Sequence, residues 1–250
     1  MLVDAFMFFN ELDVLEIRLN SLAKDVDLFI LCEGTHTHAG DPKPLYFQEN
    51  QDRFKDFPIR YVLYRNDPGQ LPWHEENAQR DYMWEFCGDL PQDAVIMISD
   101  CDEIPNLEDY PKGSNAVFRN MLFYFWLNAW TGQTMRGTIA MRHGDINRSF
   151  SSLRRRRYRM GLPVYDGWHF GYLGDPHVKI NALAHTEFNT PEVHNRLDAA
   201  KADLFDPFAR GKQHFSVAMP SGPKWLLDNI DRYKQYIYPD PEQIAIDNLL

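Results

Sequence analysis

The sequence predicts an α/β protein in which a mixed, mostly parallel sheet is flanked by helices. Apolar runs of strand length alternate with helical periodicity in the first third of the chain, a rhythm typical of parallel strands joined by helices. The 250 residues are 44% apolar and 14% aromatic, which is enough for one large domain with a substantial core. No repeat or linker divides the chain, so we expect a single domain over residues 1–250.

The first predicted unit is a strand followed by a helix. Residues 1–9 are apolar apart from Asp4, and they read as the first core strand. Asn10 can cap the helix that follows. Four leucines would share one face of this helix, namely Leu12, Leu15, Leu19 and Leu22.

Two further strands and a helix are predicted before residue 90. The second strand covers residues 27–32, and a polar loop at 33–37 follows its end. Residues 59–63 form the third strand. Residues 77–86 form a helix, with Gly88 as its stop.

The pattern changes in the second half of the chain. An aromatic-rich strand region covers residues 118–126, and further strands and loops are expected over 134–180. Residues 189–206 are polar and at most partly helical. A final amphipathic helix is expected over 224–236.

The segment Asp100-Cys101-Asp102-Glu103 is the most informative one for function. It directly follows the apolar run 94–98, so its carboxylates emerge where open α/β sheets bind ligands. Oxygen ligands of this kind suit Mn²⁺ or Mg²⁺, which in turn bind diphosphates. The segment indicates a metal-dependent enzyme acting on a phosphorylated substrate. The alternative is an acidic turn that caps a helix or faces water.

Charge and cysteine content narrow the class of protein. The formal net charge of -10 argues against general nucleic-acid binding, which relies on a basic surface. Cys32, Cys87 and Cys101 give neither a disulfide framework nor zinc-ligand spacing, so a reducing, cytoplasmic location is expected. No stretch is long enough to span a bilayer, and the first residues lack the marks of a signal peptide.

In their order along the chain, several motifs resemble glycosyltransferase family 17, which has animal, bacterial and viral members. The acidic segment continues as Ile104-Pro105, as in the metal motif of that family, and Gly167-Trp168-His169-Phe170 is similar to its Gly-Trp-His signature. The other similar segments are residues 9–19, Glu33 with 40–47, 153–158 and 184–189. Together they cover roughly residues 3 to 238.

The resemblance implies a GT-A type, Rossmann-like fold and the inverting transfer of a sugar. The implied donor is UDP-GlcNAc, since N-acetylglucosamine is the sugar moved by the characterised animal enzyme. The implied acceptor is a hydroxyl of a glycan or glycoconjugate. A nucleotide-binding half over about residues 1–110 and an acceptor and catalytic half over about 111–250 are expected. The lack of a membrane anchor favours a bacterial or viral type of member.

This chemistry needs a cation for the leaving diphosphate. Asp102 is the expected metal ligand, with Asp100 binding the metal directly, through water, or binding the ribose instead. Glu103 either supports this site or caps the turn before Pro105. His169 is expected as a third ligand or a diphosphate contact, and the alternative is a histidine packed against Trp168.

A base must also take the proton of the acceptor hydroxyl. Glu187 is the preferred candidate, with His185 as a partner that tunes it. Asp166 is the second candidate. The alternative for either residue is a solvated loop carboxylate or a helix cap.

Cationic and aromatic side chains are expected to bind the nucleotide sugar. Arg155 and Arg157 could supply guanidinium groups to the diphosphate, although in a strand only alternate arginines would reach one site. Arg80 is a further candidate, with an exposed pair to Glu76 as its alternative. Trp168 could stack on the sugar or base, although such aromatics are more often core residues.

Two other functions remain open from the sequence. One is a metal-dependent phosphohydrolase or nucleotidyltransferase, because these enzymes also place aspartates at strand ends. The other is a non-catalytic sugar-binding protein on a degenerate transferase fold.

Overall fold

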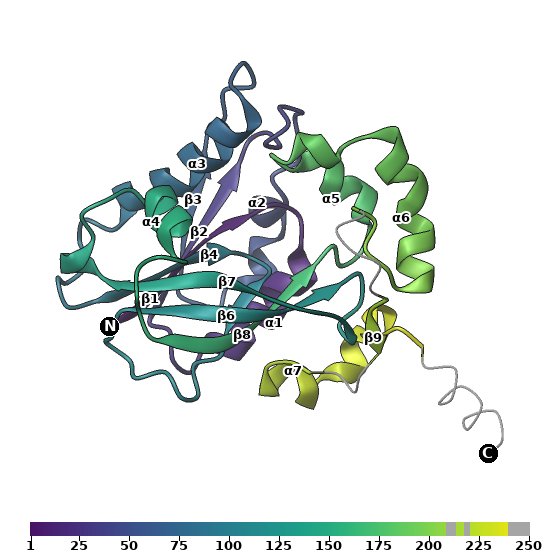
Figure 1. Ribbon diagram of the computed structural model, residues 1–250. Coiled ribbons are helices and arrows are strands. Elements are labelled where there is room, and N and C mark those ends of the chain that lie inside the picture. The colour runs from purple at the N-terminus through teal and green to yellow at the C-terminus, as the bar shows by residue number, and fades with distance from the viewer. Residues whose placement is uncertain (209–213, 218–220, 240–250) are drawn as a thin grey trace.

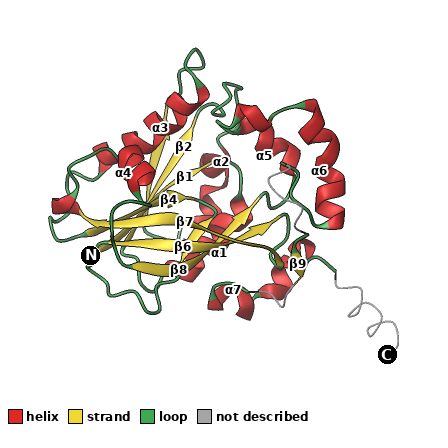
Figure 2. Ribbon diagram, in the orientation of Figure 1, coloured by secondary structure: helices red, strands yellow, loops and turns green. Residues whose placement is uncertain are grey.

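A computed structural model describes residues 1–208, 214–217 and 221–239. Within these residues the strands form a single mixed sheet with helices against both faces (Figures 1 and 2). The order of the strands along the sheet is β3-β2-β1-β4-β7-β6-β8-β5, and β9 pairs with β7. The predicted α/β class with a mostly parallel sheet flanked by helices is therefore confirmed.

Four parallel strands form the first half of the sheet, and antiparallel neighbours extend it. The parallel strands are β1 (Leu2–Phe8), β2 (Leu28–Gly34), β3 (Ile59–Tyr64) and β4 (Val95–Asp100). β7 (Ala129–Arg142) pairs antiparallel with β4 and with β6 (Ala116–Tyr124). β8 (Val164–Gly171) is parallel to β6, and the short β5 (Glu103–Pro105) and β9 (Ser216–Val217) complete the sheet.

The helices and 3₁₀ turns connect these strands. The helices are α1 (Leu12–Leu22), α2 (Tyr46–Asn50), α3 (Pro72–Tyr82), α4 (Phe150–Arg156), α5 (Pro176–Ala182), α6 (Pro191–Asp203) and α7 (Lys224–Asp228). The 3₁₀ helices cover Gln51–Phe54, Met83–Phe86, His143–Asp145, Thr186–Phe188 and Ile230–Tyr236. Among the described residues, no helix has the length and apolar content needed to cross a membrane.

The core lies on both faces of the sheet because side chains alternate along each strand. In β1, Phe6 and Phe8 pack with α1 on one face. Val3 and Ala5 of the same strand pack on the other face, against residues of α4 and the 3₁₀ turn after α3. A third cluster joins the ends of β6 and β7 to α5 and α6. Burial on two faces explains why the parallel strands are continuous apolar runs.

Two predicted helix starts were wrong. The helix expected over 77–86 begins at Pro72, because proline is well placed in the first turn of a helix, where its missing N–H costs nothing. The predicted cap Asn10 does not cap α1. Glu11 is the residue at the N-cap position, and no side chain forms the capping hydrogen bond.

Three further expectations for the second half need correction. The arginine-rich segment is the helix α4 rather than a strand, begun by a hydrogen bond from the Ser152 amide to the Ser149 hydroxyl. Residues 191–203 form the full helix α6, which Thr190 caps. The last predicted helix is interrupted at Asn229, between α7 and a 3₁₀ helix.

Three strands approach closely behind the acidic segment. The Asn120 side chain of β6 is buried, has no hydrogen-bond partner among the described residues, and lies between glycines of β7 and β8. A Cβ atom on Gly137 would lie 2.1 Å from its Nδ2, and one on Gly167 would lie 2.5 Å from its Oδ1. The Gly167 Cβ would also lie 2.8 Å from the carbonyl oxygen of Ile104. Only glycine fits at these two positions.

Candidate active site

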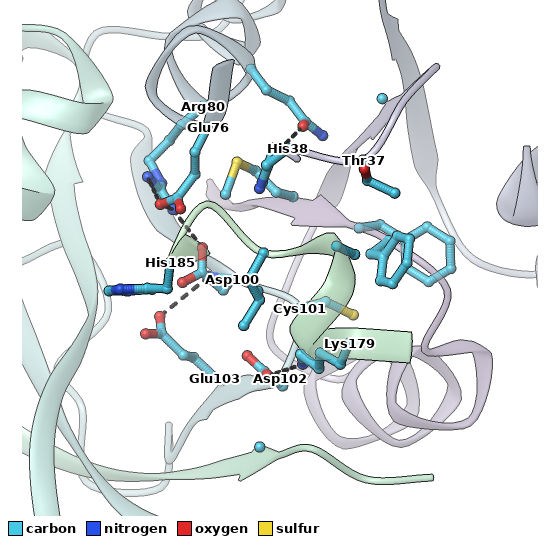
Figure 3. Close-up of a pocket in the computed structure, with 18 of the residues that line it drawn as sticks. Thr37, His38, Glu76, Arg80, Asp100, Cys101, Asp102, Glu103, Lys179 and His185 are labelled. Atoms are coloured by element: carbon cyan, nitrogen blue, oxygen red, sulfur yellow. Dashed lines mark hydrogen bonds and ion pairs between the residues drawn. The ribbon is translucent and has the colours of Figure 1, made fainter. Parts of the chain in front are cut away.

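The candidate active site is a pocket of about 550 Å³ at the carboxyl ends of the parallel strands (Figure 3). Residues of β1, β2, β4 and β8 line it, together with residues of α3, α4 and α5. This is the edge at which an open α/β sheet binds ligands. Elements from both halves of the chain thus meet in one cavity.

The pocket has a different charge balance from the rest of the chain. Its lining contains five acidic side chains and six cationic ones, although the whole chain has a formal net charge of -10. The cationic residues are Lys43, Arg80, Arg154, Arg155, Arg157 and Lys179. Lysine and arginine in a partly enclosed cleft attract anions. The pocket is therefore suited to a phosphorylated ligand.

Asp100 lies at the end of β4 between two arginines. Its Oδ1 accepts a hydrogen bond from Arg80 Nη2 at 2.7 Å, and its Oδ2 accepts one from Arg154 Nη2 at 2.9 Å. Burial alone would raise the pKa of Asp100, but the two guanidinium groups hold that pKa well below its usual range. Each oxygen of this predicted metal ligand thus already faces a cation.

Glu103 is fully buried and shares Arg154 with Asp100. Its Oε2 accepts from Arg154 Nη1 at 2.6 Å and its Oε1 from Arg154 Nη2 at 2.9 Å, so the contact is bidentate. Glu103 Oε2 also accepts the Asp100 amide at 3.2 Å. Arg154 therefore joins two carboxylates of the acidic segment, and Glu103 supports the segment from within.

Asp102 contacts two side chains from later elements. Its Oδ2 accepts from Lys179 Nζ of α5 at 2.5 Å and lies 3.3 Å from His169 Nε2 of β8. Burial opposes ionisation of Asp102, but Lys179 and His169 together hold its pKa well below the usual range. Figure 3 shows the Lys179 side chain next to Asp102, with the contact drawn as a dashed line.

Arg18 holds the acidic segment from the core side. This fully buried residue of α1 forms a two-pronged ion pair with Asp4 of β1, at 2.7 and 2.8 Å. Its Nη1 also donates to the carbonyl oxygens of Asp100, Cys101 and Glu103, at 3.1, 3.2 and 2.5 Å. The backbone of the segment is thereby fixed without use of its carboxylates.

The predicted metal ligands Asp102 and His169 fit a divalent cation that is shared with a phosphate. Their Oδ2 and Nε2 atoms are side by side, as adjacent ligands of one ion are, and a carboxylate with an imidazole suits Mn²⁺. His169 Nδ1 is buried without a hydrogen-bond partner among the described residues. Within those residues no group of three or more His, Cys, Asp or Glu side chains could hold a metal. If an ion binds here, Asp102 and His169 would be its protein ligands, and substrate and water would have to supply the others.

The predicted donor-binding residues divide into two groups. Arg80, Arg155 and Arg157 line the pocket with Asp100. Arg80 bonds both Glu76 and Asp100, so its pair with Glu76 is not an exposed one. Trp168 does not line the pocket. It neighbours His169 in β8, so its side chain lies on the other face, where it packs against the larger core cluster.

The two predicted bases lie in different places. Glu187 is 54% exposed and bonds His185 Nδ1 at 2.8 Å. Glu187 does not itself line the pocket, although His185 and Phe188 on either side of it in the sequence do. Asp166 is 68% exposed, lies outside the pocket and pairs with Arg119 at 2.9 Å. The catalytic roles of both residues stay predictions.

Four residues of the site were not singled out from the sequence. Arg154 was seen only as part of a basic cluster, and Arg18 only as part of a helix. Lys179 comes from α5, whose start carries a recognisable signal, because Asp175 caps it and Pro176 is its first residue. Glu11 lines the pocket and forms no ion pair with any described residue. Only the tertiary fold reveals that these four residues belong to the site.

Comparison with known proteins supports the resemblance drawn from the motifs. Residues 1–111 match glycosyltransferase family 17. The chain is 27% identical to a beta-1,4-mannosyl-glycoprotein 4-beta-N-acetylglucosaminyltransferase of Homo sapiens over 302 residues, which cover 96% of this chain and 55% of the human protein. The identically named protein of Rattus norvegicus is 26% identical, with coverages of 96% and 54%. The chain spans about half the length of these relatives, and its resemblance to the family is confirmed.

Proposed function

Because the chain is related to glycosyltransferase family 17, we propose that it is a metal-dependent, inverting glycosyltransferase. The proposed reaction moves N-acetylglucosamine from UDP-GlcNAc to a hydroxyl of a mannosyl glycan, the acceptor class that the name of the relatives states. The observation that carries the proposal is the acidic segment at the end of β4, in a pocket with more cationic than acidic side chains. A site with carboxylates for a metal and cations for phosphates matches a nucleotide-sugar donor.

The leaving diphosphate needs positive charge in the transition state. Arg80 and Arg154 point at Asp100 from α3 and α4, so their guanidinium groups are fixed at the pocket before a donor enters. Asp102 and His169 would hold the metal, which supplies Lewis-acid stabilisation of the diphosphate when bound. A site arranged in advance loses little free energy to reorganisation during reaction.

Inversion needs the acceptor to attack from the side opposite the diphosphate. The acceptor oxygen forms its bond to the anomeric carbon while the bond from that carbon to the diphosphate oxygen breaks. The electron pair of the broken bond leaves with the diphosphate, and the hydroxyl proton passes to the base. Glu187, which is oriented by its hydrogen bond to His185, is the base in this proposal.

A binding experiment tests the donor part of the proposal. The melting temperature should rise with UDP-GlcNAc and Mn²⁺ together, because a ligand that binds the native state stabilises it. Asp102→Asn should lose the Mn²⁺-dependent part of the rise, and Asp145→Asn, an exposed aspartate outside the pocket, should retain it. No rise with any nucleotide sugar in the folded wild type would contradict the proposal. Rapid hydrolysis of UDP-GlcNAc without an acceptor would favour the phosphohydrolase.

A kinetic experiment tests the base. Glu187→Gln should lower kcat for transfer by about 10²–10⁴-fold and leave the dissociation constant of UDP-GlcNAc unchanged. Glu11→Gln is the matched variant, since Glu11 is the pocket carboxylate without an ion pair among the described residues. If Glu11→Gln shows the loss and Glu187→Gln does not, the base is Glu11.

A further inference from the structure

One carboxylate oxygen of Asp102 contacts two basic side chains, those of Lys179 and His169. Lys179 Nζ lies 2.5 Å from Asp102 Oδ2, and His169 Nε2 lies 3.3 Å from the same atom. The Lys179 side chain is 17% exposed and the Asp102 side chain is 8% exposed, so little water screens their contact. The lysine thus neutralises the oxygen that the proposed metal would use.

A divalent cation and this ammonium group compete for Asp102 Oδ2. Mg²⁺ binds carboxylate oxygens at about 2.0–2.1 Å, so the ion and Nζ would lie within a few ångströms of each other. Like charges repel strongly at that separation in a poorly screened site. Entry of the metal at this oxygen therefore favours displacement of Lys179.

The structure offers the displaced lysine a place within the same pocket. Lys179 is attached by a flexible four-carbon stem to α5, which forms part of the pocket wall. Glu11 lines the same pocket and contributes to the electrostatic stabilisation of the Lys179 charge. A phosphate that enters with the metal would be a stronger partner for the ammonium group than either carboxylate alone.

We propose that Lys179 is an internal counterion of Asp102, which a divalent cation displaces and which then binds the donor diphosphate. The exchange at Asp102 stands on the contacts alone, and the second half of the proposal rests on the proposed function. One lysine thereby neutralises Asp102 in the empty site and adds positive charge at the diphosphate in the loaded site. Metal and nucleotide should then bind cooperatively. The metal frees Lys179 from Asp102 to bind the diphosphate, and the diphosphate draws Lys179 away from the oxygen that the metal uses.

The exchange is testable by Mn²⁺ binding without nucleotide. The electron paramagnetic resonance signal of free Mn²⁺ gives the dissociation constant for wild type and for Lys179→Gln. We expect at least about tenfold tighter binding in Lys179→Gln, because a cation at contact distance no longer opposes the metal. Lys43→Gln is the matched control, since it removes a pocket lysine that pairs with Glu33 and not with Asp102. Its Mn²⁺ affinity should stay near that of the wild type.

Two further measurements complete the test. UDP should tighten Mn²⁺ binding in the wild type, and by a smaller factor in Lys179→Gln, where no lysine must move. Asp102→Asn in the Lys179→Gln background should abolish the tight Mn²⁺ binding. Lys179→Met serves the same purpose if Lys179→Gln does not fold.

Several results would overturn the proposal. These are Mn²⁺ binding in Lys179→Gln that is equal to or weaker than wild type, absence of binding in both proteins, or an equal gain in Lys43→Gln. Failure of the proposed function has a different outcome. In that case no nucleotide binds any variant, while Lys179→Gln still binds Mn²⁺ more tightly than wild type.

Discussion

Two buried arginines hold the same acidic segment from opposite sides, and they hold different parts of it. Arg18, from α1, donates to backbone carbonyl oxygens and pairs with Asp4 in the core. Arg154, from α4, donates to the carboxylates of Asp100 and Glu103 at the pocket. One arginine thus fixes the shape of the segment and the other fixes its charges.

The difference separates folding from ligand binding in this site. The contacts of Arg18 are all inside the protein and would not change when a ligand enters. Arg154 lines the pocket, so a phosphate would meet its guanidinium group directly. Substitution of Arg18 should therefore act mainly on stability, and substitution of Arg154 on stability and nucleotide affinity together.

The largest expected effect comes from Arg18→Leu. This change leaves the Asp4 carboxylate buried and without its cation, so the free energy of unfolding should fall by about 3–5 kcal/mol. Urea denaturation measures the change. The double variant Asp4→Leu/Arg18→Leu should recover part of the loss, because no unpaired charge then remains. A loss below about 1 kcal/mol in the single variant would show that Arg18 does not hold the segment.

Arg154→Met should have the next largest effect on stability. Glu103 loses both charged hydrogen bonds, so the free energy of unfolding should fall by about 2–3 kcal/mol. The affinity for UDP, measured by calorimetry, should fall at the same time. Arg155→Met is the matched control for stability, since Arg155 is an exposed neighbour on the same helix, and its effect should stay within about 0.5 kcal/mol. Unchanged UDP affinity in folded Arg154→Met would show that Arg154, like Arg18, acts on stability alone.

The Cys32 thiol is a buried group without a counterion, and it should make the free energy of unfolding depend on pH. Burial raises the pKa of the Cys32 thiol to about 12. The neutral thiol is favoured in the folded state, so its contribution is complete below about pH 9 and is lost between pH 9 and 12, as the unfolded thiol ionises. Stability should fall by about 1.4 kcal/mol per pH unit for this group in that window. Urea denaturation over pH 8–11 should show a shallower decline in Cys32→Ala.

The smallest effect is expected at an exposed pair. Arg119 and Asp166 form an ion pair at 2.9 Å, with both side chains more than half exposed. Arg119→Gln should change the free energy of unfolding by less than about 1 kcal/mol, because water screens the pair. Urea denaturation beside Arg18→Leu compares an exposed pair with a buried one. Equal losses would show that burial is not the source of the difference.

The first half of the fold was predictable because each signal is local. The runs of β1, β2 and β4 are continuous and apolar, since the parallel strands are buried on both faces. The position of the acidic segment at the sheet edge follows from the end of β4 alone. The resemblance to the family also rested on short local motifs, such as residues 100–105 and 167–170.

The contacts of the site were not predictable in the same way. Lys179 meets Asp102 across 77 positions of sequence, and Arg18 reaches Glu103 across 85, so no spacing rule indicates either contact. The strand alternative for the arginine cluster failed because Phe150 and Leu153 are buried on one face of a helix. Trp168 and His169 are adjacent in a strand, so their side chains point to opposite faces of the sheet. The motif alone does not show this, and Trp168 was therefore wrongly expected at the site of His169.

The crowding around Asn120 restricts the order in which this site can change during evolution. At Gly137 the closest obstruction is the Asn120 side chain itself, so a residue larger than glycine becomes possible only after Asn120 has become smaller. At Gly167 the backbone carbonyl of Ile104 remains in the way, 2.8 Å from the added Cβ, whatever stands at position 120. Substitution of Gly137 should therefore follow a substitution of Asn120 by a smaller residue. Gly167 should stay glycine whichever residue occupies position 120.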